Sequence, residues 1–465
     1  MELWQSDATE LAGLIRAGKV SSVEATTAHL QRLEAVNPSI NAVVRVLADE
    51  ALDQARAADE AQARGQPLGL LHGVPVTTKI VADQRGCPTD NGIVAQKDLI
   101  AAEDGAVVAN LRRGGAIFIG RTAAPALSMR AMTSSVLHGL TLNPWNAQVT
   151  CGGSSGGAGA AVAAGIGAIA HGSDIGGSIR WPAYCNGVVG LRTSLGRVSS
   201  YNPSNRVARS LSSQLMAVSG PLARSVRDLR LALEVMAAGD PRDGVWTPAP
   251  LVGPPAPRRV ALAPAPSDIP VHPAVAQAVR DAGRHLQAAG YQVEEVELPH
   301  LREVTELWTP IGLTPLALDL PALLARINDP ALSNFLTSWV DEKGIADLPG
   351  YLAALARRDS LLTAWNSFFE RYPIIVMPSC PDPSLPAELD TQGREGALRT
   401  LEGLRFQLAC PVLGLPGLAV PVGQHAGQPL GVQIVAARFR EDLCLAAAEV
   451  IEAHEGVRTP IDPQG

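Results

Sequence analysis

Aromatic residues are scarce in this chain of 465 residues, at 4%, whereas glycine (44 residues) and proline (36 residues) are plentiful. So much glycine and proline excludes fibrous and coiled-coil architectures, which need long unbroken helices. Intrinsic disorder is excluded as well, because 46% of the residues are hydrophobic and only 18% are charged. We therefore expect a globular protein with many tight turns and a large buried core.

The cysteines lack the spacing of a disulfide framework or a zinc site. There are six, and no two of them form a C-x-x-C pair. We expect most of them to be small buried hydrophobic residues.

Basic clusters and long apolar runs are also missing. The formal net charge is −7, and the longest basic block is a pair such as Arg112-Arg113, so nucleic acid is an unfavourable ligand. The first residues do not form a basic stretch followed by an apolar one, and no segment approaches the roughly 20 apolar residues of a membrane span. The sequence predicts a soluble cytoplasmic protein without a membrane partner.

Helical and strand patterns alternate along the chain, which favours an α/β fold. We expect the first helices to include one that Ser21 to Glu24 caps and Asn37-Pro38 ends, and another over 47–64. Further helices are predicted over 107–113, about 158–170, 274–289, most of 303–370 and 443–453. Strands are predicted over 74–79, 116–120, 259–263, 292–298, 373–377, 418–422 and 432–435.

Three segments stand apart from this scaffold: Lys79 at the end of a predicted strand, the loop 152–157 and the loop 173–180. A serine hydroxyl is a weak nucleophile that needs a base, and a buried lysine can be that base because desolvation disfavours its charged form. A second serine can pass the proton between them, since a hydroxyl both donates and accepts. Glycines before the nucleophile leave backbone N–H groups free for an oxyanion.

The run from Gly152 to about Ser199, GGSSGG…GSDIGGSIRWPAYCNGVVGLRTSLGRVS, closely resembles the amidase signature family. Matches elsewhere include LHGVPVTTK at 71–79, LNPWN at 142–146 and GLPGLAVPVG near the C-terminus. The resemblance implies a central mixed β-sheet with helices on both faces. It also implies hydrolysis of a linear amide C–N bond without a metal or cofactor.

By this resemblance Lys79 is the general base, Ser154 a bridging serine at a cis peptide, and Ser178 the nucleophile that forms an acyl-enzyme. The oxyanion would be bound by the backbone amides of Ile175, Gly176, Gly177 and Ser178. Asp174 and Arg180 flank the nucleophile, and we expect them to hold the loop rather than react.

The sequence departs from the family pattern mainly where substrate specificity is expected. Ile80 follows the lysine where aspartate is common, Cys151 replaces a frequent proline, and residues 127–130 replace an acidic-aromatic stretch. We predict that the substrate is bound near these departures and near the aromatic residues of 303–370. The candidate binding residues are Met129, Arg130, Met132, Cys151 and Gly153.

The resemblance favours a single amidase domain over 1–465, with N-terminal helices in 1–65, a catalytic core in 66–240 and a helical segment over the site in 300–370. The expected substrates are small aryl or alkyl amides, and also esters and carbamates (urethanes), with some similarity to enzymes that cut nylon oligomers. The expected assembly is a monomer or a homodimer.

Other functions remain open at this point. One is the glutaminase component of a tRNA-dependent amidotransferase, and another is an inactive scaffold with the same fold. A third is an α/β-hydrolase, because Gly152-x-Ser154-x-Gly156 fits a nucleophile elbow. That alternative leaves Lys79 and the Ser178 loop unexplained.

Overall fold

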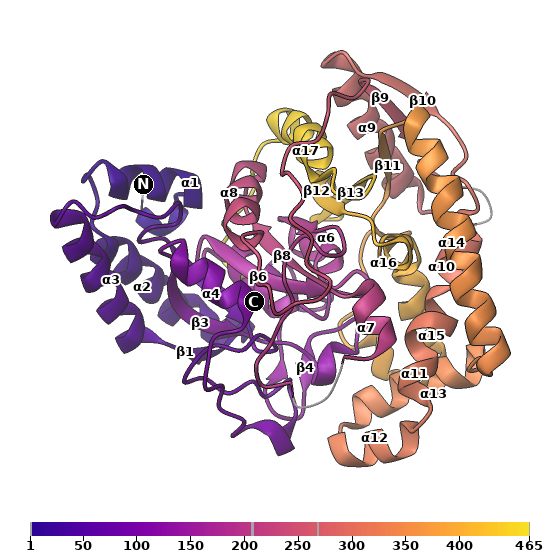
Figure 1. Cartoon of the computed structure of the whole chain (residues 1–465), viewed down its shortest axis with the longest axis horizontal. Coiled ribbons are helices and arrows are strands. Elements are labelled where there is room, and N and C mark those ends of the chain that lie inside the picture. Colours follow the sequence, from indigo (N-terminus) through magenta and orange to yellow (C-terminus); the bar gives the residue numbers. More distant parts are fainter. Residues whose placement is uncertain (1, 206–208, 267–268, 465) are drawn as a thin grey trace.

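A mixed β-sheet runs through the molecule (Figure 1). In the computed structural model, which describes residues 2–205, 209–266 and 269–464, 11 strands form this sheet in the order β1-β3-β2-β6-β8-β7-β12-β13-β11-β9-β10. The strands are β1 Val43–Val46, β2 Pro75–Lys79, β3 Ile117–Thr122, β6 Ile169–Asp174, β7 Val189–Arg192, β8 Val218–Ala223, β9 Arg259–Leu262, β10 Gln292–Glu295, β11 Ile374–Pro378, β12 Gly417–His425 and β13 Gln428–Ala436. A separate small hairpin joins β4 Ser134–Ser135 to β5 Gly139–Leu140.

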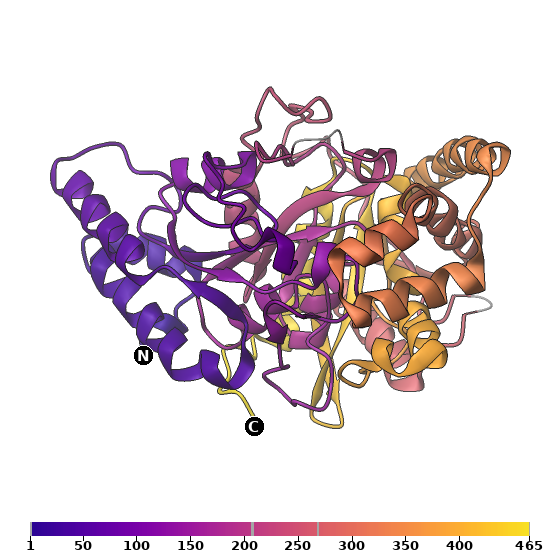
Figure 2. The same ribbon diagram turned by 90° about the horizontal axis from the view of Figure 1, so that it is seen from below.

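Helices cover both faces of the sheet, as predicted. They are α1 Ala8–Arg16, α2 Ser22–Ile40, α3 Ala48–Ala63, α4 Ala106–Arg113, α5 Gly156–Ala163, α6 Arg180–Asn186, α7 Leu211–Met216, α8 Val226–Met236, α9 Pro273–Ala288, α10 Leu301–Glu306, α11 Thr314–Ala317, α12 Leu320–Ile327, α13 Pro330–Lys343, α14 Leu348–Arg371, α15 Gly393–Gly403, α16 Ala409–Leu413 and α17 Glu441–Glu455. Figures 1 and 2 place α1–α3 at one end of the molecule and the helices of 300–371 at the other.

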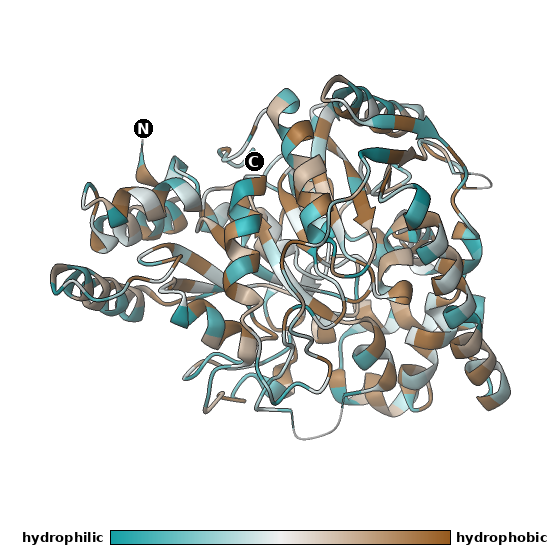
Figure 3. Ribbon diagram, turned by 45° about the horizontal axis from the view of Figure 1, so that its top comes forward, coloured by the Kyte–Doolittle hydropathy of each residue, from teal (hydrophilic) through white to brown (hydrophobic). Residues whose placement is uncertain are grey.

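Alternation along the strands divides the core between the two faces. In β11, Ile374 and Val376 belong to the core that includes α8, α9 and α17, whereas Ile375 and Met377 pack in the core of the 300–371 helices. Successive side chains of a strand point to opposite faces, so one strand contributes to both cores. Figure 3 shows hydrophilic and hydrophobic residues together on most helices, as expected where one helix face packs on the sheet.

Two predicted helix ends are wrong. Helix α2 passes Pro38 and ends at Ile40, because Asn41 takes a left-handed conformation with φ of 50° and donates its N–H to the carbonyl of Asn37. The helix predicted over 158–170 stops at Ala163, after which Gly165 adopts a φ of +82°. The alanine-rich composition concealed the change from this helix to strand β6.

The sheet also contains strands that the sequence patterns did not predict. β1, β7 and β8 are short or rich in small residues, so their alternation is weak, and they are defined by pairing with neighbours far along the chain. The strand predicted over 292–298 ends at Glu295. Residues 303–370 are mostly helical, as predicted, with a π-helical turn over Thr309–Leu313.

Within the described residues, no single helix is both long and apolar enough to cross a bilayer. One bent pair of segments, Leu301–Ala317 and Leu320–Ile327, meets the criteria of length and composition alone.

Candidate active site

Lys79 is the last residue of β2, and parallel pairing of β2 with β6 brings it beside Ser173 near the end of β6. The carboxyl ends of parallel strands meet at one edge of a sheet, where α/β proteins commonly place their sites. Lys79 is fully buried at 0% exposure. The fold thus carries an amino group into the interior, at the edge where the two loops converge.

Three serine hydroxyls surround this amino group. Lys79 Nζ lies 2.7 Å from Ser154 Oγ, 3.1 Å from Ser155 Oγ and 3.1 Å from Ser173 Oγ. The structure therefore brings Lys79 and Ser154 together at hydrogen-bond distance. The Gly153–Ser154 peptide bond is cis, as the family resemblance implies.

Burial lowers the pKa of Lys79 to about 7, although the Asp174 carboxylate opposes this shift. The hydroxyls that face the amino group are uncharged, so they do not stabilise an ammonium as a carboxylate in contact would. Burial thus favours the neutral amine over the ammonium. This is the protonation state that a general base requires.

Close backbone packing holds the serine loop in place. A side-chain carbon on Gly157, in the first turn of α5, would lie 2.6 Å from the backbone nitrogen of Ala123. Only glycine permits this approach, which lets α5 and the loop before it sit directly on the strand ends. The Ser155 N–H donates to the Ser178 carbonyl at 3.2 Å, so the two serine loops are neighbours.

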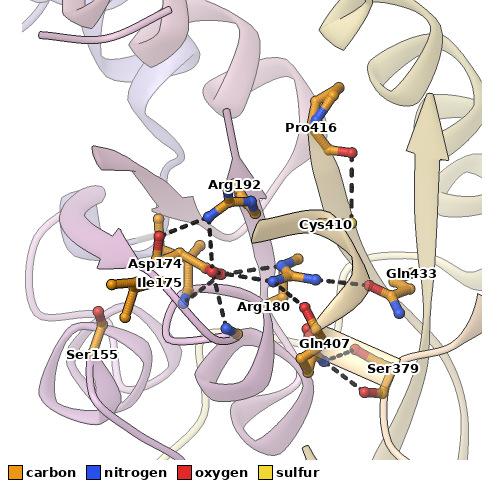
Figure 4. A network of polar contacts seen from close by, with 12 residues as sticks. Ser155, Asp174, Ile175, Arg180, Arg192, Ser379, Gln407, Cys410, Pro416 and Gln433 are labelled. Carbon is orange, nitrogen blue, oxygen red and sulfur yellow. Dashed lines mark hydrogen bonds and ion pairs between the residues drawn. The ribbon is translucent and has the colours of Figure 1, made fainter. Parts of the chain in front are cut away.

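A buried ion triad holds the loop that carries Ser178 (Figure 4). Arg180 donates to both oxygens of the Asp174 carboxylate at 3.1 Å, and Arg192 donates to one of them at 3.2 Å. Burial alone would raise the pKa of Asp174, but the two guanidinium groups outweigh it and hold this pKa well below its ordinary value. As expected for a structural role, Asp174 and Arg180 bind each other and the loop.

The triad also bears on the predicted oxyanion hole. Asp174 Oδ1 accepts the N–H of Gly177 at 2.9 Å, so this amide is already occupied. Within the described residues, the amides of Ile175, Gly176 and Ser178 have no acceptor. Of the four predicted donors, these three remain available for an oxyanion.

We expect Asp174→Asn to destabilise the protein by about 3–5 kcal/mol, because two buried arginines would lose their counter-charge. Urea unfolding measures this loss. As a matched control, Glu449→Gln breaks the ion pair of Arg230 with Glu449, in which both side chains are 43% exposed. That change should cost about 0–1 kcal/mol, and equal effects of the two substitutions would contradict the structural role of the triad.

A small cavity opens beside Ser178, with a volume of about 40 Å³. Aromatic and aliphatic side chains form much of its wall, and Trp308 stacks on Trp339 with ring centroids 4.8 Å apart. The lining residues are Ser128, Met129, Arg130, Ala131, Gly153, Ile175, Gly176, Ser178, Trp308, Phe335, Trp339, Leu404 and Leu408. Ser154 and Ser155, both at 0% exposure, are not among them.

The predicted binding residues divide into two groups. Met129, Arg130 and Gly153 line the cavity. Met132 is 1% exposed and packs in the core, and Cys151 is 1% exposed with its thiol 3.3 Å from the carbonyl of Thr141, so neither lines the cavity. Burial also raises the pKa of Cys151 to about 12, which disfavours it as a nucleophile.

Several residues of the candidate site were not predicted from the sequence. Ser155 and Ser173 lie in the motif loops, yet only the fold shows that their hydroxyls reach Lys79. The aromatic content of 303–370 signalled a cavity wall without indicating which rings form it. Asp390, which binds Arg130 through two hydrogen bonds of 2.8 Å, gave no signal because it lies 260 residues away.

The described part of the chain holds no group of three or more His, Cys, Asp or Glu side chains that could bind a metal ion. His171, near the site, is fully buried, and burial lowers its pKa to about 3. The groups that surround Lys79 are serine hydroxyls, and the loop before Ser178 adds backbone amides.

Comparison with known families identifies the family of this chain. The profile of the Amidase family matches residues 24–445. The chain belongs to the amidase family. Membership confirms the resemblance drawn from the two loops and excludes the α/β-hydrolase alternative.

Relatives at the sequence level span nearly the whole chain. Indoleacetamide hydrolase of Bradyrhizobium diazoefficiens is 48% identical over 458 residues, which cover 98% of this chain and 87% of that protein. Acylamidase of Rhodococcus erythropolis is 32% identical, covering 97% and 95%. A component of the glutamyl-tRNA(Gln) amidotransferase of Moorella thermoacetica is also 32% identical, covering 97% of each chain.

Solved structures of the family share the fold. A 6-aminohexanoate cyclic dimer hydrolase complexed with substrate matches with a TM-score of 0.85 and 29% identity, covering 99% of both chains. A bacterial aryl acylamidase of the amidase signature family matches with a TM-score of 0.83 and 26% identity, covering 97% of this chain and 96% of that one. This amidase is accordingly an enzyme that hydrolyses amide C–N bonds.

Proposed function

We propose that this amidase cleaves small uncharged amides with an aromatic or alkyl acyl group through an acyl-enzyme on Ser178. The proposal depends chiefly on one observation: buried Lys79 lies 2.7 Å from Ser154, next to a cavity with aromatic walls that Ser178 lines. None of the three serines in contact with Lys79 lines that cavity. Among the serines of the two loops, Ser178 is therefore the one that a bound amide would meet.

Each proton has a defined route in this mechanism. As Ser178 Oγ bonds to the amide carbon, its proton passes to Ser154, and Ser154 gives its own proton to neutral Lys79. The resulting ammonium returns a proton through Ser154 to the amine nitrogen, the C–N bond breaks, and the amine leaves. Water then attacks the ester on Ser178 by the same relay and releases the carboxylic acid.

The amides of Ile175, Gly176 and Ser178 would stabilise the negative oxygen that develops in both steps. The Asp174 triad holds the loop that carries these amides through the neighbouring Gly177 N–H and Arg180, which limits the reorganisation that accompanies the charge. This arrangement supports acyl transfer from esters and carbamates as well, because each presents a carbonyl oxygen to the same donors.

The cavity favours an uncharged, preferably aromatic acyl group. Arg130 is the one charged side chain among the described lining residues, and Asp390 neutralises it in a pair whose side chains are both 0% exposed. Trp308, Phe335 and Trp339 form an aromatic part of the cavity wall that an aryl group could contact. The 48% identity to an indoleacetamide hydrolase makes arylacetamides the first substrates to test.

The glutaminase alternative also has support, from the 32% identity to the amidotransferase component. Glutamine carries an α-ammonium and a carboxylate, and a neutralised cavity offers them no counter-charge. We expect kcat/KM for an arylacetamide to exceed that for glutamine by about 10- to 100-fold. This factor corresponds to the free energy gained by burying one aromatic ring. Ammonia release measured on both substrates tests this order. Faster turnover of glutamine would replace the proposal by the glutaminase function.

A further inference from the structure

Trp308 contacts both the cavity and the loop of the oxyanion hole. Its indole Nε1–H donates to the carbonyl oxygen of Ile175 at 2.7 Å, and the residue is 3% exposed. A side-chain carbon on Gly176 would lie 3.6 Å from two atoms of the indole ring. The ring also stacks against Trp339. One side chain of the helical segment thus holds the loop before the nucleophile.

The peptide group between Ile175 and Gly176 connects this hydrogen bond to the proposed oxyanion hole. The carbonyl of Ile175 and the N–H of Gly176 are the two ends of one planar trans peptide unit, so they point in opposite directions. Fixing the oxygen therefore fixes the direction of the N–H. Within the described residues that N–H has no acceptor, and Gly176 lines the cavity.

The neighbouring peptide group is fixed by a different part of the fold. Asp174 accepts the N–H of Gly177. Gly177 has a φ of +110°, and a side-chain carbon added to it would lie 2.6 Å from Cβ of Gln407. Two anchors, a carboxylate of strand β6 and an indole of the helical segment, hold consecutive peptide groups. The Asp174 anchor restrains Gly177 but leaves rotation of the Ile175–Gly176 unit to be restrained by Trp308.

We propose that Trp308 is a positioning residue that aims the Gly176 N–H at the carbonyl oxygen of the bound amide. The inference rests on the proposed function, in which Ser178 attacks that carbonyl. Since Trp308 also lines the cavity, the wall that contacts the acyl group and the oxyanion donor are parts of one rigid unit. The indole then stabilises the transition state by orienting the Gly176 N–H, in addition to contacting the substrate.

The test is Trp308→Phe, which removes the indole N–H and keeps an aromatic ring. A donor that is lost outright costs about 10²–10³-fold in kcat, and a donor that is only less well aimed should cost less. We expect kcat and kcat/KM for an arylacetamide to fall together by about 10-fold while KM changes less than about twofold, as for an interaction made only in the transition state. A residue that merely fills the cavity wall would raise KM instead.

Trp365→Phe is the matched control. Trp365 lies in α14 of the same helical segment, is 0% exposed and donates its indole N–H to the carbonyl of Pro299 at 2.8 Å, but it does not line the cavity. This variant loses the same kind of hydrogen bond and should keep kcat and KM. A thermal melt of both variants shows that each is folded under the assay conditions.

A pair of inhibitors provides a second measurement. An arylacetaldehyde adds to Ser178 as a hemiacetal whose oxygen occupies the oxyanion position, whereas the matching aryl alcohol binds without that oxygen anion. Trp308→Phe should weaken the aldehyde by about the factor lost from kcat and leave the alcohol unchanged. Unchanged kcat, or equal weakening of both inhibitors, would overturn the role of Trp308. If the aldehyde does not inhibit the wild-type enzyme and Ser178→Ala retains activity, the proposed function fails instead.

Discussion

Replacing Ser178 by alanine is expected to lower kcat for an amide by about 10⁴- to 10⁶-fold, because the acyl-enzyme can no longer form. The cavity and the relay would remain in place, so substrate should still bind. A fluorophosphonate that traps activated serines should label wild-type Ser178 and leave the variant unlabelled. Peptide-resolved mass spectrometry locates the label in the wild type and checks that it is missing from the variant.

Ser155→Ala is the matched control for this labelling experiment. Ser155 is buried beside Lys79 at 3.1 Å and does not line the cavity, so the adduct on Ser178 should persist in this variant. An adduct on Ser154 or Ser155 in the wild type would contradict the assignment of the nucleophile. Absence of any adduct in a protein that hydrolyses amides would contradict serine catalysis itself.

The second large effect is expected at Lys79. Lys79→Ala should lower kcat by about 10²- to 10⁴-fold, the usual contribution of a general base. In the wild type the rate should rise with pH through about 7, because the amine becomes neutral as the pH passes the lowered pKa of Lys79. The variant should lose this rising limb, and a full pH profile of kcat/KM on one substrate tests the expectation.

Two further variants make that profile decisive. Lys79→Arg keeps a cation at the same place but has no neutral form near pH 7, so its activity should be as low as that of Lys79→Ala. Glu452 is remote from the cavity, and burial raises its pKa to about 7, so it titrates in the same range. Glu452→Gln should keep the rising limb. A limb that survives in Lys79→Ala would remove the lysine from the mechanism.

Sequence patterns predicted the long elements of this protein well. Strand β2, helices α3, α9 and α17, and the helical character of 303–370 follow from periodicity and capping, which are local properties of the chain. The errors fall where local signals are weak. Beside Ala163 the composition continues unchanged while the backbone turns at Gly165, and β8 contains proline and glycine yet pairs with β6 over six residues.

In the candidate site, too, local motifs identified some residues and long-range packing decided others. The motifs singled out Lys79, Ser154 and Ser178 as the proposed catalytic groups, because Lys79 ends a predicted strand and both serines lie in glycine-rich loops. They did not predict Ser173 beside the lysine, or that Gly177 donates its amide to Asp174. They placed Met132 and Cys151 near the substrate, whereas packing carries both side chains into the core.

The sequence by itself determined the family and fold class of this protein, an α/β amidase, and it proposed a lysine and two serines as the catalytic groups. Only the tertiary structure decided how these groups behave. Parallel pairing of β2 with β6 buries Lys79 among hydroxyls and thereby lowers its pKa. Contacts across more than a hundred residues bring Trp308 to Ile175, and such long-range contacts leave no periodic trace in the chain.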